Sequence, residues 1–183
     1  MVQRCALYAL LCTIKNMNQI KLDYQFDAPI EKVWAILADV TTTPEWVHGV
    51  KQSIATDEGK ARKGFCWEEK VSIDGQNADI QNEFVEWVAQ KHAAIKTSLP
   101  MGGWMRKQFQ FSPLPNSLPA GAEKGEEGEF SERAEGCLLS IEMTWNLGIL
   151  EMLAGPTKVY TALEKSLHKT LENWKIRTIT QTN

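Results

Sequence analysis

Alternation of apolar and polar residues predicts a series of β-strands along most of the chain. The first covers residues 19–26, in which every second residue is apolar, and the clearest covers 137–147. Five further strand-like runs, separated by turn residues, lie at 50–56, 64–73, 79–88, 92–99 and 104–111. Between the second and third of these runs, the Asp74-Gly75 pair predicts a two-residue hairpin turn.

The sequence pattern does not decide which face of the run at 79–88 points inward. Ile80 and Phe84 share one face of this strand, whereas Val85 and Trp87 share the other. Only one of these pairs can point toward a core unless a β-bulge intervenes.

Apolar residues at helical spacing predict helices near both ends of the chain. After the first strand, Asp27 is a candidate N-cap, and Pro29 suits the first turn of a short amphipathic helix that runs to about residue 38. A second short turn carries Glu45 and Trp46, and a lead-in helix at 150–154 precedes a long final helix. The apolar stripe of this final helix consists of Val159, Leu163, Leu167, Leu171 and Trp174. Five to seven strands, two short early helices and one long final helix form an α+β pattern.

The composition fits one globular domain that buries a full core. The chain has 183 residues, of which 43% are hydrophobic and 23% are charged. Its formal net charge of −3 argues against nucleic acid or an anionic membrane as the main partner. Seven tryptophans are many for this length, and because large rings are costly to leave exposed, they indicate an aromatic interior or cavity.

Two segments differ from the rest of the chain. Residues 1–16 contain a ten-residue apolar stretch too short to span a bilayer, and we interpret them as an extension before a single domain over 17–183. A secretory signal fits less well, because Lys15 and Asn16 stand where small cleavage-site residues are expected. Residues 113–136, rich in proline, glycine and glutamate, are predicted to form a mobile acidic surface loop.

The cysteines and histidines show no pattern typical of a metal site. Cys5, Cys12, Cys66 and Cys137 form no CxxC pair and have no zinc-binding spacing with histidine. We expect free or buried thiols in a reducing compartment, the cytoplasm, with a structural disulfide as the alternative. The chain also has no nucleophile motif and no glycine-rich phosphate loop, so neither a metal nor a cofactor is expected.

Three segments together resemble a known family. Residues 26–39 read FDAPIEKVWAILAD and run on to the PEW sequence at 44–46, which resembles the opening of the START-like (SRPBCC) superfamily, close to its polyketide cyclase/dehydrase group. The VEW sequence at 85–87 is similar to the central strand of that family, and 166–174 is similar to its closing helix. The resemblance covers about residues 19–178.

The resemblance implies a helix-grip fold, in which a seven-stranded antiparallel sheet curls around the last helix with an apolar cavity between them. Members of the family bind lipids, sterols, polyketides and aromatic compounds, and some are cyclases, hydroxylase domains or chaperone regulators. The fold alone therefore does not name a function. We predict a protein that binds or carries an apolar small molecule. A cyclase/dehydratase-type enzyme and a protein-interaction module are the alternatives.

Glu69 and His48 are the candidate acid/base residues. Glu69 is in phase with Phe65, Trp67 and Val71 on the predicted buried face, where a carboxylate is costly unless it is paired, neutralised or solvated. It could contact a ligand or transfer a proton; alternatively, a bulge turns it outward or a salt bridge holds it at the sheet edge. His48 follows Trp46, near the expected cavity entrance, where a surface or structural role is the alternative.

Lys107 and the aromatic residues complete the candidate set. Lys107 shares a face with Met105 and Phe109, and we favour a solvated lysine near a strand end over one that pairs with Glu69 or a ligand carboxylate. The aromatic residues either line the cavity or form plain core. The expected ligand contacts are Trp46, Trp67, Glu69, Trp87, Phe109, Phe111, Met143, Trp145, Tyr160 and Leu163.

Overall fold

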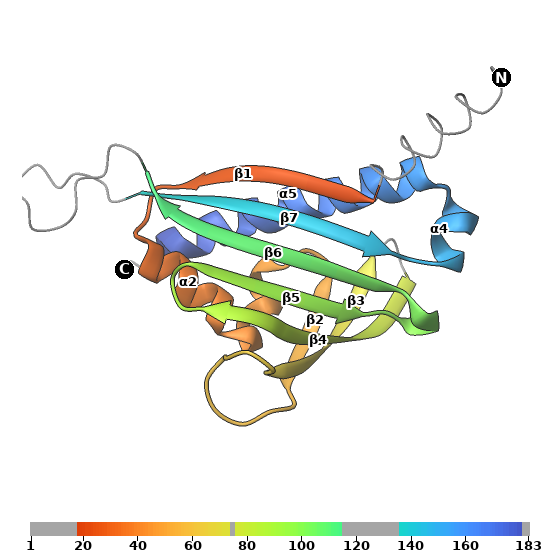
Figure 1. The fold of residues 1–183 in the computed structure, drawn as a ribbon, viewed down its shortest axis with the longest axis horizontal. Coiled ribbons are helices and arrows are strands. Elements are labelled where there is room, and N and C mark those ends of the chain that lie inside the picture. The colour runs from red at the N-terminus through yellow and green to blue at the C-terminus, as the bar shows by residue number, and fades with distance from the viewer. Residues whose placement is uncertain (1–17, 74–75, 115–135, 181–183) are drawn as a thin grey trace, which may run out of the picture.

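The computed structural model of the chain describes residues 18–73, 76–114 and 136–180. Its seven strands form one antiparallel sheet in the order β1-β7-β6-β5-β4-β3-β2. The strands are β1 (Gln19–Phe26), β2 (Val50–Ala55), β3 (Cys66–Ile73), β4 (Gln76–Val88), β5 (His92–Ser98), β6 (Trp104–Pro113) and β7 (Cys137–Asn146). The sheet curls around the long helix α5 (Pro156–Thr180), as Figure 1 shows. The predicted α+β class and the curved antiparallel sheet around a C-terminal helix are confirmed.

Three short helical segments connect β1 to β2, and two more lie later in the chain. The segments between β1 and β2 are α2 (Ile30–Ala38), the 3-10 turn η1 (Val40–Thr42) and α3 (Thr43–Trp46). The 3-10 turn η2 (Pro100–Gly102) joins β5 to β6, and α4 (Ile149–Ala154) precedes α5. The helix at α2 begins after Pro29, which is its N-cap, so the prediction that Asp27 caps it is wrong. Asp27 instead forms an ion pair with Lys175 of α5 at 2.8 Å, which ties the start of α2 to the C-terminal helix.

A β-bulge decides which face of β4 points inward. The pairing register between β4 and β5 shifts between Phe84 and Glu86, so one extra residue enters β4 there. Phe84 is fully buried, and its ring lies 4.6 Å from that of Trp87. Phe84 and Trp87 therefore both point into the core, although strict alternation would place them on opposite faces.

Trp174 of α5 is the centre of the aromatic core. It has no exposed surface, and its ring lies 5.6 Å from Phe26, 4.6 Å from Trp46 and 6.1 Å from Phe109. These rings come from β1, α3 and β6. One side chain thus joins the helix to three separate segments, and burying so large a ring is worth several kcal/mol, about 3–5.

Several sequence predictions fall on residues that the structure does not describe. Residues 1–16 lie outside the described residues, as does 115–135, nearly all of the predicted acidic loop. The Asp74-Gly75 turn also lies outside them, but Ile73 pairs with Gln76 across it, as a two-residue hairpin requires. Cys66 and Cys137 are free thiols, whereas the other two cysteines are not described. Within the described ranges, no helix combines the length and the apolar character needed to cross a membrane.

Candidate functional site

A cavity of about 150 Å³ lies between the inner face of the sheet and α5. A space of this size is comparable to an engineered protein cavity that holds one benzene molecule. Its walls come from α2, η1, α3, the six strands β2 to β7 and α5. The strand residues in the lining are Val50, Trp67, Glu69, Val71, Ile80, Asn82, Ile95, Met105, Lys107, Phe109, Ile141 and Met143. The helical wall consists chiefly of Leu37, Val40, Trp46, Leu163, Leu167, Leu171 and Trp174.

The lining is apolar because the alternating faces of the strands and the stripe of α5 meet here. Every second residue of β7 from Cys137 to Trp145 is buried, and Ile141 and Met143 reach the cavity itself. From the other side, Leu163, Leu167 and Leu171 follow each other at intervals of four residues along α5. An apolar molecule in this space would therefore exchange contacts with water for contacts with apolar side chains.

Glu69 is a buried carboxylate in this apolar wall. Only 7% of the residue is exposed, and its Oε1 accepts a hydrogen bond of 3.0 Å from the indole Nε1–H of Trp67. The pairing of β3 with β4 runs through Glu69 without a register shift, so no bulge turns this residue outward. None of the ion pairs among the described residues includes Glu69. Both alternatives to an inward Glu69 are therefore wrong.

Lys107 also lines the cavity, which corrects the prediction of a solvated lysine near a strand end. The residue is half-buried on the inner face of β6. Burial lowers the pKa of Lys107 below its usual value of 10.5, while the charge of Glu69 acts in the opposite direction. Arg106, the next residue, points to the other face of the sheet and bonds Glu86 at 2.5 Å.

Asn82 adds a polar group that the sequence analysis did not single out. It is 4% exposed, and its Oδ1 accepts a hydrogen bond of 2.6 Å from the hydroxyl of Thr97. Its Nδ2 has no hydrogen-bond partner within the described ranges. The signal was present in the sequence, because Asn82 lies midway between Ile80 and Phe84 on the same face. Buried donors are rarely left unpaired, so this amide calls for an explanation.

Two indole N–H groups of cavity residues also lack a hydrogen-bond partner among the described residues. The Nε1 atoms of Trp46 and Trp174 are buried, and neither has a partner in the part of the chain that the structure describes. Both tryptophans line the cavity. Together with Asn82, they place three unpaired N–H groups on residues around one space, and an unpaired buried donor costs about 1–3 kcal/mol.

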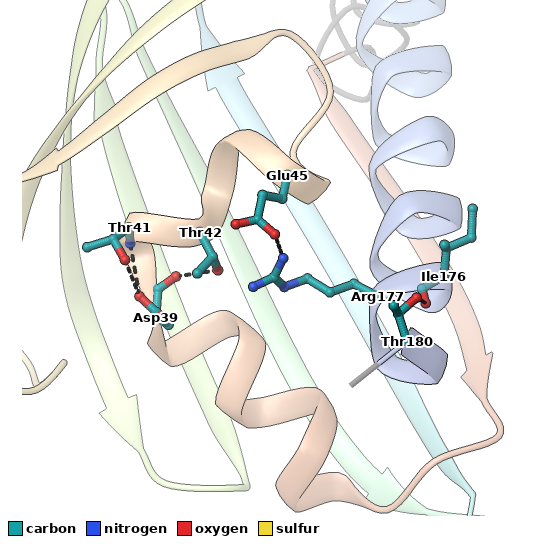
Figure 2. Close-up of polar contacts among 7 residues, drawn as sticks. All are labelled: Asp39, Thr41, Thr42, Glu45, Ile176, Arg177 and Thr180. Atoms are coloured by element: carbon teal, nitrogen blue, oxygen red, sulfur yellow. Dashed lines mark hydrogen bonds and ion pairs between the residues drawn. The ribbon is translucent and has the colours of Figure 1, made fainter. Parts of the chain in front are cut away.

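His48 and the preceding helix α3 lie against α5 at the cavity. The backbone N–H of His48 donates a hydrogen bond of 3.0 Å to the Thr170 hydroxyl of α5, and His48 lines the cavity. Figure 2 shows a second link between the same elements, an ion pair between Glu45 of α3 and Arg177 of α5. These two contacts hold α3, and with it Trp46, against the C-terminal helix.

The turn before α3 is fixed by Asp39, as Figure 2 also shows. Its carboxylate accepts hydrogen bonds from the backbone N–H of Thr41 at 3.2 Å and from the hydroxyl of the same residue at 2.6 Å. The hydroxyl of Thr42 donates to the backbone oxygen of Asp39 at 2.9 Å. An Asp side chain that caps its own turn in this way sets the direction in which the chain enters α3.

Six of the expected ligand contacts line the cavity, and four lie elsewhere. Those at the cavity are Trp46, Trp67, Glu69, Phe109, Met143 and Leu163, joined by the acid/base candidate His48. Trp87 and Phe111 pack against Trp34 of α2, with ring centroids 4.6 and 5.2 Å away, so the short helix covers them. Trp145 lies beside Tyr160, 6.3 Å away, near the start of α5. These four are absent from the cavity lining.

The described residues contain no group of three or more His, Cys, Asp or Glu side chains that could hold a metal ion. The ionisable side chains in the described lining are His48, Glu69 and Lys107. The arrangement can accordingly do two things: bind an apolar molecule that carries oxygen atoms, and transfer protons between that molecule and these three groups.

Comparison with known proteins places this arrangement in a family. The family model described as polyketide cyclase / dehydrase and lipid transport matches residues 17–175. The chain belongs to this family. The resemblance to the START-like superfamily is therefore confirmed. A comparison with curated protein sequences found no match.

Solved structures share the fold of this polyketide cyclase/dehydrase family member at low sequence identity. The Zhui aromatase/cyclase from Streptomyces sp. R1128 has a TM-score of 0.64 and 16% identity, over 90% of this chain and 95% of that one. A conserved protein from Geobacillus kaustophilus has a TM-score of 0.68 and 11% identity, over 88% and 95%. A START superfamily protein from Mycobacterium smegmatis has a TM-score of 0.53 and 18% identity, over 84% and 97%. Likeness at such identities establishes the fold alone.

Proposed function

We propose that the protein binds or carries an apolar small molecule, such as a lipid, a polyketide or an aromatic compound, in the cavity between the sheet and α5. The observation that carries the proposal is the cavity itself: about 150 Å³ lined mainly by apolar side chains of six strands and α5. Ligand sites of proteins are typically apolar spaces with a few polar groups that fix the orientation of the ligand. Here those groups are Glu69, Asn82 and Lys107.

The unpaired hydrogen-bond donors narrow the chemical class of the ligand. The N–H groups of Asn82, Trp46 and Trp174 have no partner among the described residues, and all three residues line the cavity. A ligand oxygen would satisfy one or more of them and recover the free energy that their burial costs. We infer an apolar ligand with at least one oxygen acceptor. The family, described as polyketide cyclase / dehydrase and lipid transport, and the aromatase/cyclase among the structural relatives are compatible with such a ligand.

The test is to fill the cavity and measure whether binding is lost. Ile95 is 8% exposed and lines the cavity, so an Ile95→Phe change places extra atoms inside it. Ile54 of β2 is 48% exposed and is the matched control for the same change on a strand. Benzyl alcohol is titrated into each protein by calorimetry. We expect the wild type and Ile54→Phe to bind it equally and Ile95→Phe to bind at least about tenfold more weakly. Equal binding by all three proteins would contradict the proposal.

A cyclase or dehydratase-type reaction is the second candidate, because Glu69, His48 and Lys107 all line the one cavity. Ring closure and dehydration both need proton transfer to and from a bound substrate, and positioned side chains of this kind typically contribute about 10²–10⁴-fold to the rate. Glu69→Gln keeps the shape and an acceptor oxygen for Trp67 but removes the acid/base group. Under the enzyme proposal, turnover of an aromatic-forming polyketide substrate falls by that factor while benzyl alcohol binding is retained; unchanged turnover removes Glu69 from the reaction.

A further inference from the structure

We propose that Lys107 forms a reversible imine with aldehyde ligands of single-ring size, which makes the cavity a covalent carbonyl-binding site. The inference rests on the proposed function, because it concerns the same cavity. It assigns to Lys107 a chemical role that apolar binding alone does not require. The argument comes from where Lys107 lies, from what surrounds it and from the space in front of it.

The surroundings of Lys107 favour an amine over an ammonium ion. The side chain projects from β6 into the cavity, and no ion pair among the described residues includes it. Two other ionisable side chains face this space in the described lining: Glu69 from β3 and His48 from the segment after α3. Burial lowers the pKa of Lys107, and the opposing attraction of Glu69 does not cancel this. A desolvated lysine with a lowered pKa is the usual amine nucleophile toward carbonyl compounds.

The lining supplies the other parts that imine formation needs. The free Nδ2–H of Asn82 can donate a hydrogen bond to a carbonyl oxygen, which stabilises the negative charge that develops there during attack. Glu69 carries the carboxyl group that can move protons within the cavity. The apolar walls keep water scarce around the product, and imines persist better where water is excluded. The volume of about 150 Å³ accommodates one aromatic ring.

The reaction is balanced without an oxidant or a reductant. The lone pair of the Lys107 Nζ attacks the carbonyl carbon, a C–N bond forms, and the π electrons of the C=O bond move to oxygen. A proton passes from nitrogen to that oxygen and gives a carbinolamine. The hydroxyl group then leaves as water with a proton drawn from solvent through Glu69, and the nitrogen lone pair forms the C=N bond. One aldehyde, one amine and one proton give one protonated imine and one water, and the charge of Glu69 stabilises the cationic product.

The test is reductive trapping on the full chain. The protein is incubated with benzaldehyde and sodium cyanoborohydride near pH 7.5, and the modified lysines are located by peptide mass spectrometry. We expect one benzyl group on Lys107, added at least about tenfold faster than on the exposed Lys51, because the cavity holds the aldehyde next to the amine and the lowered pKa of Lys107 enlarges its neutral fraction. Excess benzyl alcohol should slow the labelling of Lys107 but not that of Lys51. Lys107→Met, which keeps the length of the side chain, should lose the fast adduct.

The outcomes separate this inference from the proposed function. Binding of benzyl alcohol with fast labelling of Lys107 supports both. Binding of benzyl alcohol with labelling only at exposed lysines overturns the imine and leaves the cavity function intact. Failure of benzyl alcohol to bind, together with labelling only at exposed lysines, overturns both. Because the modified residue is mapped in the wild-type protein, the result does not depend on whether Lys107→Met folds.

Discussion

Replacing Lys107 with methionine is expected to make the protein more stable. The two side chains have similar length and volume, so the change mainly removes a half-buried amine at the cavity that has no ion-pair partner among the described residues. Burying a polar group without a partner costs about 1–3 kcal/mol. In a domain of this size, 1 kcal/mol shifts the melting temperature by about 2–4 °C, so we expect Lys107→Met to melt about 2–12 °C higher than the wild type at pH 7.

The stability gained by Lys107→Met should decrease as pH rises. Because the pKa of Lys107 is lowered in the folded protein, the unfolded chain binds more protons between that pKa and the usual value of 10.5. Wild-type stability, relative to the variant, therefore rises across this interval. The advantage of Lys107→Met is complete below the folded pKa and fades as pH approaches 10.5.

Urea denaturation at pH 7 and pH 10.5 measures both effects, with Lys51→Met as the control. Lys51 lies on β2 and is exposed, so its replacement should change the free energy of unfolding by less than about 0.5 kcal/mol at either pH. A variant at Lys107 that is less stable than the wild type, or whose advantage is the same at both pH values, would refute the reasoning that Lys107 is held in an apolar cavity as an unpaired amine.

Three further predictions test the packing around the cavity. Trp174→Ala should lower the free energy of unfolding by about 3–5 kcal/mol in urea, because the ring is fully buried among four aromatic neighbours; a loss below about 1.5 kcal/mol would contradict that packing. Thr97→Val should cost about 1–3 kcal/mol, since it removes the 2.6 Å hydrogen bond to Asn82, while Thr97→Ser should cost less. Burial raises the pKa of the Cys137 thiol to about 11, so iodoacetamide at pH 8 should modify it only after unfolding; peptide mapping that finds it alkylated in the folded protein as fast as Cys66 would be the contrary result.

Periodicity predicted most of the fold because each element has one buried face. The seven predicted strands agree with the structure to within a few residues at each end, and the stripe of α5 faces the sheet as expected. The ambiguous strand at 79–88 shows the limit of this reasoning. A bulge between Phe84 and Glu86 allows Phe84 and Trp87 to point the same way, and no pattern of two-residue period contains that information.

Periodicity identified the inward face but not the position of each residue along the sheet. Phe109 and Phe111 are both inward residues of β6, yet Phe109 lines the cavity while Phe111 packs under α2. The difference depends on where the short helices and the start of α5 cover the curled sheet, which is a property of the assembled fold. For the same reason, Lys107 could not be placed at the cavity from its sequence alone, since a lysine at an inward position near a strand end usually reaches solvent.

The most direct test of the central claim is native mass spectrometry of the purified full chain, followed by solvent extraction and identification of whatever is released. The account predicts a bound apolar molecule with at least one oxygen atom, present on the wild type and on Ile54→Phe and absent from Ile95→Phe. A protein that carries no ligand and also fails to bind benzyl alcohol would contradict the claim that this cavity is a binding site, and would favour a role in contacts with another protein.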